Sequence, residues 1–302
     1  MTDMFIAILN MSLIASFVAL GVILIRIPLK KAPKIFSYGL WIIVLFKLLC
    51  PFTIESVLSP VPVKAEPVPR DIIYSQTPYI DSGIHFVDNS INRVITNTVS
   101  PANHAASPNT MKVVLFVLSC IWLAGIAILL LYALVSYFRL KARLSVAIPV
   151  HKNIYETDRI KTAFVLGIAN PKVYIPVGLD RQEVDYILRH EETHIRRRDH
   201  LIKPLAFIAV CVHWFNPVVW FSYYLAMRDM ELSCDESVLK RYGSDIRRDY
   251  SNSLLSLSAK QSGMISPLAF GENGVKGRIK NVLNYKKPAV WVSILAIIAV
   301  IV

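Results

Sequence analysis

The residues from His190 to His200, HEETHIRRRDH, hold three histidines and two adjacent glutamates within eleven positions. On a helix, His190 and His194 lie one turn apart, so their rings share one face. Glu191, next to the first histidine, can then reach a water held at the same ion. This HExxH spacing is typical of zinc hydrolases. We therefore expect one Zn²⁺ per chain, with His190 and His194 as ligands and Glu191 as the catalytic base.

The third ligand is not the nearby His200. It stands ten residues after His190, as in the HExxHxxGxxH motif, but that motif needs a glycine where this chain has Arg197. Arginine favours continuation of a helix. In a continuous helix, His200 would lie about 240° around the axis from His194. We therefore exclude His200 as a ligand.

A better third ligand lies in ELSCD, which runs from Glu231 to Asp235. An ExxxD pair on a second helix offers one carboxylate, that of Glu231, to the ion. The second carboxylate, that of Asp235, can hold a ligand histidine through its other ring nitrogen. Cys234 is an alternative thiolate ligand, which we rank below Glu231 because the spacing favours the carboxylate.

The stretch between the two motifs, residues 201–227, is apolar, and Lys203 is its only charged residue. If this stretch crossed a membrane as one helix, Glu231 and His190 would lie on opposite sides. Asn216-Pro217 is expected to break the helix. We therefore predict a hydrophobic hairpin of two arms, each about 20 Å long, which returns Glu231 to the side of His190. His213, at its tip, is expected to have a capping or interfacial role.

The composition indicates the surroundings of this site. Of 302 residues, 54% are hydrophobic and 18% are charged, and the mean hydropathy is +0.48. A soluble domain of this length has too little interior for so much apolar surface. The net charge of +12 is expected to gather on the cytoplasmic side of a membrane, so we predict no direct contact with nucleic acid. The four cysteines form no CxxC pair and indicate no disulfide framework.

The expected elements position the site in a cytoplasmic domain. Basic clusters follow the first and third apolar runs, so the N-terminus is expected outside. A helix is predicted from Asp180 to His200, with Asp180 and Glu183 at the spacing of a capping box, and VYIP (residues 173–176) is predicted to be a strand. The last apolar run stops at Val302, too short to cross a bilayer, so a further segment is expected after it. The expected organisation is two transmembrane helices with a short basic loop (1–54), an extracellular loop rich in Pro, Ser and Asn (55–112), a third transmembrane helix (113–138), the cytoplasmic domain (139–287) and the start of a fourth transmembrane helix (288–302).

HEETHIRRRDH, HWFNPVVW and ELSCDE, preceded by GIANPKVYIP, resemble the BlaR/MecR-type membrane zinc metallopeptidases of bacteria. The resemblance implies a mainly α multi-pass membrane protein of the bacterial cell membrane, with an α+β, gluzincin-like zinc protease domain in the cytoplasm. It assigns the zinc ligands, the base and the outer carboxylate to the residues named above. It also implies that Val173, Tyr174 and Ile175 form an edge strand along which an extended substrate lies.

The resemblance further implies a signalling role. In antibiotic-sensing members, an extracellular penicillin-binding domain follows the last span, and the protease cleaves itself and brings about loss of a DNA-bound repressor. We therefore expect a sensor domain after Val302, and a substrate that is the chain itself or a cytoplasmic repressor-type protein. The stimulus would be an extracellular signal of the β-lactam or cell-wall class. Membrane lipids are expected partners, and a homodimer is an open alternative. The polar residues from Ser251 to Asn284 form a plausible segment for self-cleavage.

Two other functions fit the same motifs. A housekeeping membrane protease of the HtpX or CAAX type shares HExxH with a later glutamate, and a non-catalytic receptor or scaffold could carry a structural zinc. Structural zinc, however, generally has four protein ligands and no open position. The sequence leaves the oxyanion-stabilising residue open among four candidates, Tyr174, His200, His213 and Tyr242.

Overall fold

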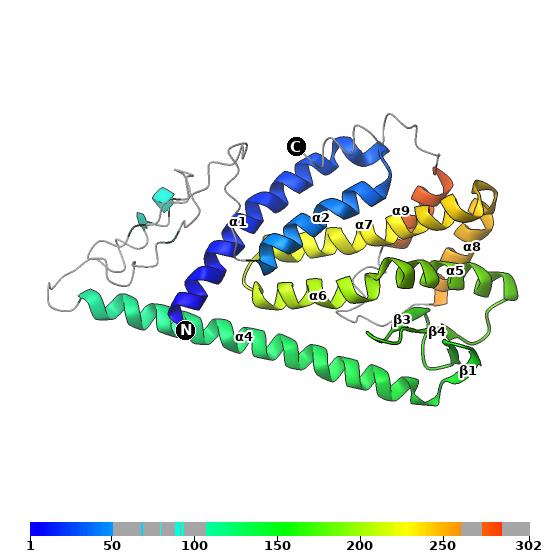
Figure 1. The fold of residues 1–302 in the computed structure, drawn as a ribbon, viewed down its shortest axis with the longest axis horizontal. Coiled ribbons are helices and arrows are strands. Elements are labelled where there is room, and N and C mark those ends of the chain that lie inside the picture. The colour runs from blue at the N-terminus through cyan, green and yellow to red at the C-terminus, as the bar shows by residue number, and fades with distance from the viewer. Residues whose placement is uncertain are drawn as a thin grey trace. The chain divides into compact units, whose positions relative to one another are not determined.

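A computed structural model describes residues 1–50, 68, 79, 88–90, 92–93, 107–260 and 274–285. The described part is mainly helical and includes a small four-stranded mixed sheet (Figure 1). Its longer helices are α1 (Thr2–Arg26), α2 (Lys34–Leu49), α4 (Ser107–Arg143), α5 (Arg181–Arg197), α6 (Asp199–Val212), α7 (Pro217–Tyr242), α8 (Arg247–Lys260) and α9 (Val275–Leu283). Short 3₁₀ helices are η1 (Pro28–Lys31), η3 (Leu144–Val146) and η4 (Ser244–Ile246).

The chain divides into two compact units. The first unit comprises Met1–Ile23, Ile42–Leu130 and Ala209–Trp220, and the second comprises Leu24–Trp41, Leu131–Ile208 and Phe221–Val302. All the predicted site residues lie in the second unit. The first unit holds most of the apolar helices and the turn between α6 and α7.

Two helical segments, residues 2–26 and 112–146, are long and apolar enough to cross a membrane among the residues that the structure describes. They agree with the first and third predicted spans. The second span was predicted over residues 35–54, and α2 covers its first part as a helix of 16 residues. The fourth predicted span, from about residue 289, lies outside the described residues, as does most of the predicted extracellular loop.

The break predicted at Asn216-Pro217 is present, because α6 ends at Val212 and α7 begins at Pro217. In the first unit, side chains of this turn are bound by the apolar helices. The Asn216 amide donates to the hydroxyl of Ser12 at 2.8 Å, and the His213 ring bonds to the carbonyl oxygen of Leu48 at 3.0 Å. Gly125 is needed here, since a Cβ at that position would lie 2.3 Å from the indole of Trp214.

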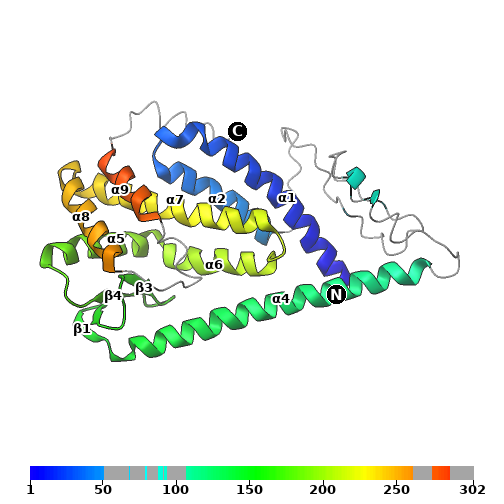
Figure 2. The same ribbon diagram turned by 180° about the vertical axis from the view of Figure 1, so that it is seen from behind.

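In the second unit, α7 returns beside α6, as both views of the fold show (Figures 1 and 2). The rings of Phe207 on α6 and Tyr223 on α7 pack edge to face with centroids 6.2 Å apart. Farther along, Lys203 Nζ on α6 lies 3.1 Å from Glu231 Oε1 on α7. The antiparallel pair therefore carries Glu231 back to the level of α5.

The four strands are β1 (Ile148–His151), β2 (Ile154–Thr157), β3 (Phe164–Leu166) and β4 (Lys172–Pro176). Their order in the sheet is β1-β2-β4-β3, with β2 and β4 parallel and the other pairs antiparallel. The predicted strand over Val173, Tyr174 and Ile175 exists, but its prediction as an edge strand was wrong. Both sides of β4 are already paired, so its backbone cannot accept an extended substrate. The edge strands are β1 and β3, which stand at the two ends of the strand order.

Helix α5 begins as predicted, with a capping box in which the Asp180 backbone N–H donates to the Glu183 carboxylate at 3.3 Å. Its end was predicted at His200, which was wrong. Arg198 adopts a left-handed conformation (φ 61°), and its N–H closes the last turn onto His194 and Ile195. This is a common way for a helix to end, although glycine is usual at that position. Helix α6 then starts at Asp199.

The packing of α5 fixes the site on the second unit. One face of α5 lies on the sheet, where Ile187 packs with Val173 and Ile175. Its other face joins a core formed with α7, α8 and α9. That core contains Tyr186, Val238, Leu239, Tyr250, Leu254, Val282 and Tyr285. A helix that is covered on two sides can hold short polar side chains in fixed directions.

Candidate metal centre

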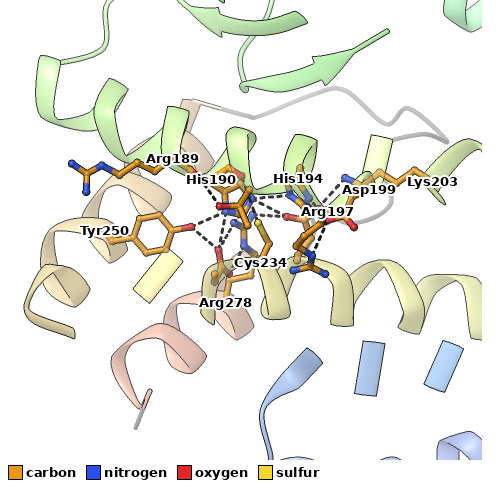
Figure 3. A network of polar contacts seen from close by, with 12 residues as sticks. Arg189, His190, His194, Arg197, Asp199, Lys203, Cys234, Tyr250 and Arg278 are labelled. Carbon is orange, nitrogen blue, oxygen red and sulfur yellow. Dashed lines mark hydrogen bonds and ion pairs between the residues drawn. The ribbon is translucent and has the colours of Figure 1, made fainter. Parts of the chain in front are cut away.

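The three predicted ligands meet between α5 and α7, and Figure 3 shows His190 and His194 side by side on α5. His190 Nε2 lies 3.1 Å from His194 Nε2 and 3.4 Å from Glu231 Oε2, and His194 Nε2 lies 3.6 Å from Glu231 Oε1. All three side chains are buried. Two ligand atoms of a tetrahedral ion with bonds of about 2.1 Å are about 3.4 Å apart. The two ring nitrogens lie close enough to each other and to the two oxygens of the Glu231 carboxylate for these three residues to hold one zinc ion.

Cys234 is a further potential ligand on α7. Its Sγ and ring nitrogens of His190 and His194 all lie within 4.8 Å of one another, and all three residues are buried. Its Sγ also lies 3.5 Å from the carbonyl oxygen of His190. On a helix, Glu231 and Cys234 are three residues apart and face the same side. The geometry therefore keeps both the carboxylate and the thiolate as third-ligand candidates.

Glu191 lies on α5 beside the two histidines and is 8% exposed. The sequence predicts that this glutamate acts on a water at the ion. No described contact ties it directly to His190, His194 or Glu231. Its role as the base therefore stays a prediction.

His194 is held by Asp199, a residue that the sequence reasoning missed. His194 Nδ1 donates to Asp199 Oδ2 at 2.7 Å, and Asp199 is completely buried. In a continuous helix, residue 199 would be rotated about 140° from His194. The left-handed residue Arg198 turns the chain so that this carboxylate faces the ligand. The bond fixes the proton on Nδ1 and leaves Nε2 free for a metal ion.

His190 is held by two residues. Its Nδ1 donates to the hydroxyl oxygen of Tyr250 at 2.8 Å, and that hydroxyl donates to Asp235 Oδ1 at 2.7 Å. The carboxylate also lies 3.3 Å from Nδ1 itself. The predicted outer carboxylate Asp235 is thus next to His190. Tyr250, which lies on α8, was not predicted, because a single tyrosine outside the motifs carries no signal of its own.

Arg278 on α9 is the third residue that the sequence did not predict. Its guanidinium makes a two-point contact with Asp235, with Nε–Oδ2 at 2.9 Å and Nη2–Oδ1 at 2.7 Å. It also reaches the ligands: Nη1 lies 3.3 Å from Glu231 Oε2, and Nη2 lies 3.2 Å from His190 Nε2. A ring nitrogen cannot serve the guanidinium and a metal ion with one lone pair. Arg278 must therefore turn away from Nε2 when an ion binds, and Asp235 remains to hold it.

The cations around the site keep its carboxyl groups ionised. Burial alone would raise the pKa of Asp235, but Arg278 and His190 hold that pKa well below its ordinary value. Burial likewise opposes ionisation of Glu231, whose pKa lies well below its ordinary value because of Lys203 and the two histidines. For Cys234, burial raises the pKa, and His190 and His194 lower it to about 7. The ligating forms of both candidates are therefore accessible near neutral pH.

None of the four candidates for the oxyanion-stabilising residue is among the described partners of the ligands. Tyr174 packs with Leu144 and Ile160 on the sheet face opposite to that of its neighbours Val173 and Ile175, which pack against α5. The remaining candidates also have other surroundings: His213 belongs to the first unit, the ring of Tyr242 lies under Arg189, and His200 follows the break after α5.

Replacing Tyr250 by Phe is expected to weaken zinc binding about tenfold, because His190 loses the hydroxyl that fixes its ring while the aromatic packing remains. Zinc affinity of the purified chain, measured by competition with a chromophoric chelator, checks this. The matched control is Tyr242→Phe, whose ring contacts Arg189 and Arg241 outside the ligand network. Equal affinities of the two variants would contradict the role of the Tyr250 hydroxyl.

A family model described as BlaR1 peptidase M56 matches residues 6–282 of the chain. The chain is also similar to the "Regulatory protein BlaR1" of Bacillus licheniformis, with 26% identity over 194 residues, which are 55% of this chain and 32% of that protein. A second relative is the "Methicillin resistance mecR1 protein" of Staphylococcus aureus, with 25% identity over 309 residues. That match covers 92% of this chain and 51% of the relative. The chain therefore spans about half, or less, of the length of these relatives.

Proposed function

This chain belongs to the BlaR1 peptidase M56 family. We propose that it is a membrane-embedded zinc endopeptidase that transmits an extracellular signal by cleaving a peptide bond. The observation that carries the proposal is the close approach of the two ring nitrogens of His190 and His194 to each other and to the carboxylate oxygens of Glu231, at 3.1 to 3.6 Å. Glu191, which stands between the two histidines in the sequence, is buried. Three protein ligands with a neighbouring glutamate favour a catalytic over a structural zinc.

In this mechanism, His190, His194 and Glu231 would hold the ion, and Cys234 is the alternative to Glu231. A bound zinc ion supplies a Lewis acid that polarises the scissile carbonyl and lowers the pKa of a water. Glu191 takes a proton from the attacking water and later gives it to the leaving amine. Meanwhile Asp199 and the Tyr250–Asp235 pair keep the two imidazole rings oriented.

An extended substrate would pair with the sheet along β3. Strand β4 is paired on both sides, whereas the outer edge of β3 is unpaired within the described ranges. Helix α5, which carries the histidines, packs against Val165 of β3. Addition of a peptide strand to an open sheet edge is a common mode of recognition. The substrates we propose are a cytoplasmic repressor-type protein and the chain itself, cut between Ser251 and Lys287.

We propose that the protein lies in a bacterial cell membrane, with its N-terminus outside and the metal centre on the cytoplasmic side. The apolar helices α1 and α4 support membrane insertion. Each has basic residues at its C-terminal end, Arg26 in α1 and Lys141 and Arg143 in α4. By the positive-inside rule, these ends face the cytoplasm. Residues 139–287 then form the cytoplasmic protease domain that enters the membrane with the hairpin over 201–227.

The proposal is tested with the full chain in proteoliposomes. The metal is removed with a chelator, and one equivalent of zinc is then added back. Cleavage is measured without and with added unfolded membrane proteins that are unrelated to this chain. We expect zinc-dependent cleavage of the chain, with new termini between Ser251 and Lys287 identified by mass spectrometry. Broad degradation of the unrelated proteins would instead favour a housekeeping protease. A zinc-loaded chain that cuts neither itself nor added protein would contradict an endopeptidase.

A further inference from the structure

The segment that joins α1 to α2 lies in the second unit together with the metal centre. This segment, residues 26–41, which we call the α1–α2 hairpin, ends 149 residues before the first ligand, His190, in the sequence. Its contacts with the centre are polar and specific. The most direct one comes from Tyr38, whose hydroxyl donates to Asp199 Oδ1 at 3.0 Å. The other oxygen of that carboxylate holds His194 Nδ1 at 2.7 Å.

A second contact fixes the part of α7 that carries Glu231. Asp229, two residues before it, is 1% exposed and receives three hydrogen bonds. Arg26 donates from Nε at 2.7 Å and from Nη2 at 2.6 Å, and the indole N–H of Trp41 donates at 2.8 Å. The Arg26 guanidinium also lies over the Trp41 ring.

A third contact lies beside Asp235. The backbone N–H of Lys34 donates to Glu236 Oε2 at 2.7 Å, and the other oxygen of Glu236 accepts from Asn281 of α9 at 3.1 Å. The hairpin therefore contacts the surroundings of the ligands at three places. It contacts the partner of His194, a neighbour of Glu231 and the neighbour of Asp235.

Packing alone does not require these contacts. Apolar side chains would hold the hairpin against α7 without the cost of burying Asp199 and Asp229 as carboxylates. A buried carboxylate with defined donors fixes the relative position of the groups that donate to it. The Asp199 carboxylate accepts from Tyr38 and from the ring of the ligand His194. The direction of the His194 lone pair then depends on where the hairpin holds Asp199.

We propose that the α1–α2 hairpin is the positioning element of the metal centre and that Tyr38 acts, through Asp199, on the ligand His194. The inference rests on the proposed function in taking the bound cation as zinc. Tyr38 is a positioning residue, since it touches neither the ion site nor a substrate. A shift of the first two helices would then move the Asp199 carboxylate and change how strongly the site holds its metal.

The test is a double-mutant cycle read by metal binding. Tyr38→Phe removes one hydroxyl and keeps the ring that lies under Arg197. It is expected to weaken zinc affinity about tenfold and to change the visible spectrum of the cobalt-substituted protein, because an outer partner that orients a ligand is lost. In the Asp199→Asn background, the same substitution is expected to have no further effect. The matched control is Tyr186→Phe, a tyrosine of similar burial whose hydroxyl accepts from Gln182.

The possible outcomes separate the positioning role of Tyr38 from the proposed function. Equal zinc affinities and cobalt spectra for Tyr38→Phe and Tyr186→Phe would overturn the inference, whatever the cleavage activity. Additive effects of Tyr38→Phe and Asp199→Asn would overturn the route through Asp199. If the wild type binds zinc and shows the predicted cycle but cleaves no peptide, the proposed function fails and the positioning role stands. If the wild type binds no zinc, both fail.

Discussion

Replacing Glu191 by Gln is expected to reduce peptide cleavage by about a thousandfold, in the range of what a positioned base contributes, and to leave one zinc per chain. Glutamine has nearly the same shape but cannot accept the proton of the attacking water. The ligand atoms of His190, His194 and Glu231 are unchanged, so the ion has the same three donors. Zinc content by elemental analysis and self-cleavage in proteoliposomes, measured on the same sample, check the two halves of this expectation.

The matched control for this substitution is Glu192→Gln, which makes the same change one residue later on α5. Glu192 lies on the exposed side of the helix and lines a shallow surface pocket with Asn153 and Arg196. We expect it to keep both zinc and cleavage. If Glu191→Gln retained the cleavage rate of the wild type, Glu191 would not be the base. If it retained both zinc and signalling without any cleavage, the chain would be a zinc-containing receptor or scaffold.

The parts of the site that the sequence predicted are local. A helix that begins with a capping box at Asp180 and Glu183, and that carries two histidines one turn apart, follows from spacing alone. The break at Asn216-Pro217 follows from the chemistry of proline. Together these features place ELSCD near HEETH, because two helical arms of similar length must return to where they began.

The residues that the sequence did not predict act over long separations or against local preference. Arg198 ends α5 in a left-handed conformation that glycine or asparagine normally marks, so the RRRDH run indicated a continuing helix. As a result, Asp199 was missed as the partner of His194. Tyr250, Arg278 and Tyr38 are isolated polar residues in three other helices. Their approach to the centre depends on tertiary packing, which periodicity does not contain.

The order of the strands was also beyond the sequence. VYIP has the composition of a buried strand, and Val173 and Ile175 do pack against α5. Whether such a strand is central or at an edge depends on which neighbours pair with it. Here β3 pairs antiparallel with β4, so the open edge on that side of the sheet is β3 and not β4.

Replacing Glu231 by Ala is expected to lower zinc affinity by more than a hundredfold, which exceeds the effect of losing an outer partner. The alanine removes the carboxylate that completes the ligand set and takes from Lys203 its carboxylate partner, whereas Arg278 keeps its two-point contact with Asp235. The charge of Lys203 beside the two histidines then adds to the loss of the ligand. Elemental analysis of the purified protein should then find less than one tenth of a zinc per chain, with helix content by circular dichroism unchanged.

Two comparisons make this substitution decisive. Cys234→Ala removes the alternative ligand, and we expect it to keep zinc, because the carboxylate of Glu231 completes the ligand set without the thiolate. His200→Ala is also expected to keep zinc, since His200 lies beyond the break at Arg198, on α6. Loss of zinc in Cys234→Ala with retention in Glu231→Ala would make the thiolate the third ligand. If His200→Ala lost zinc while Glu231→Ala and Cys234→Ala kept it, His200 would be a ligand and the ion would lie near the end of α5. Glu231 would then not be a zinc ligand.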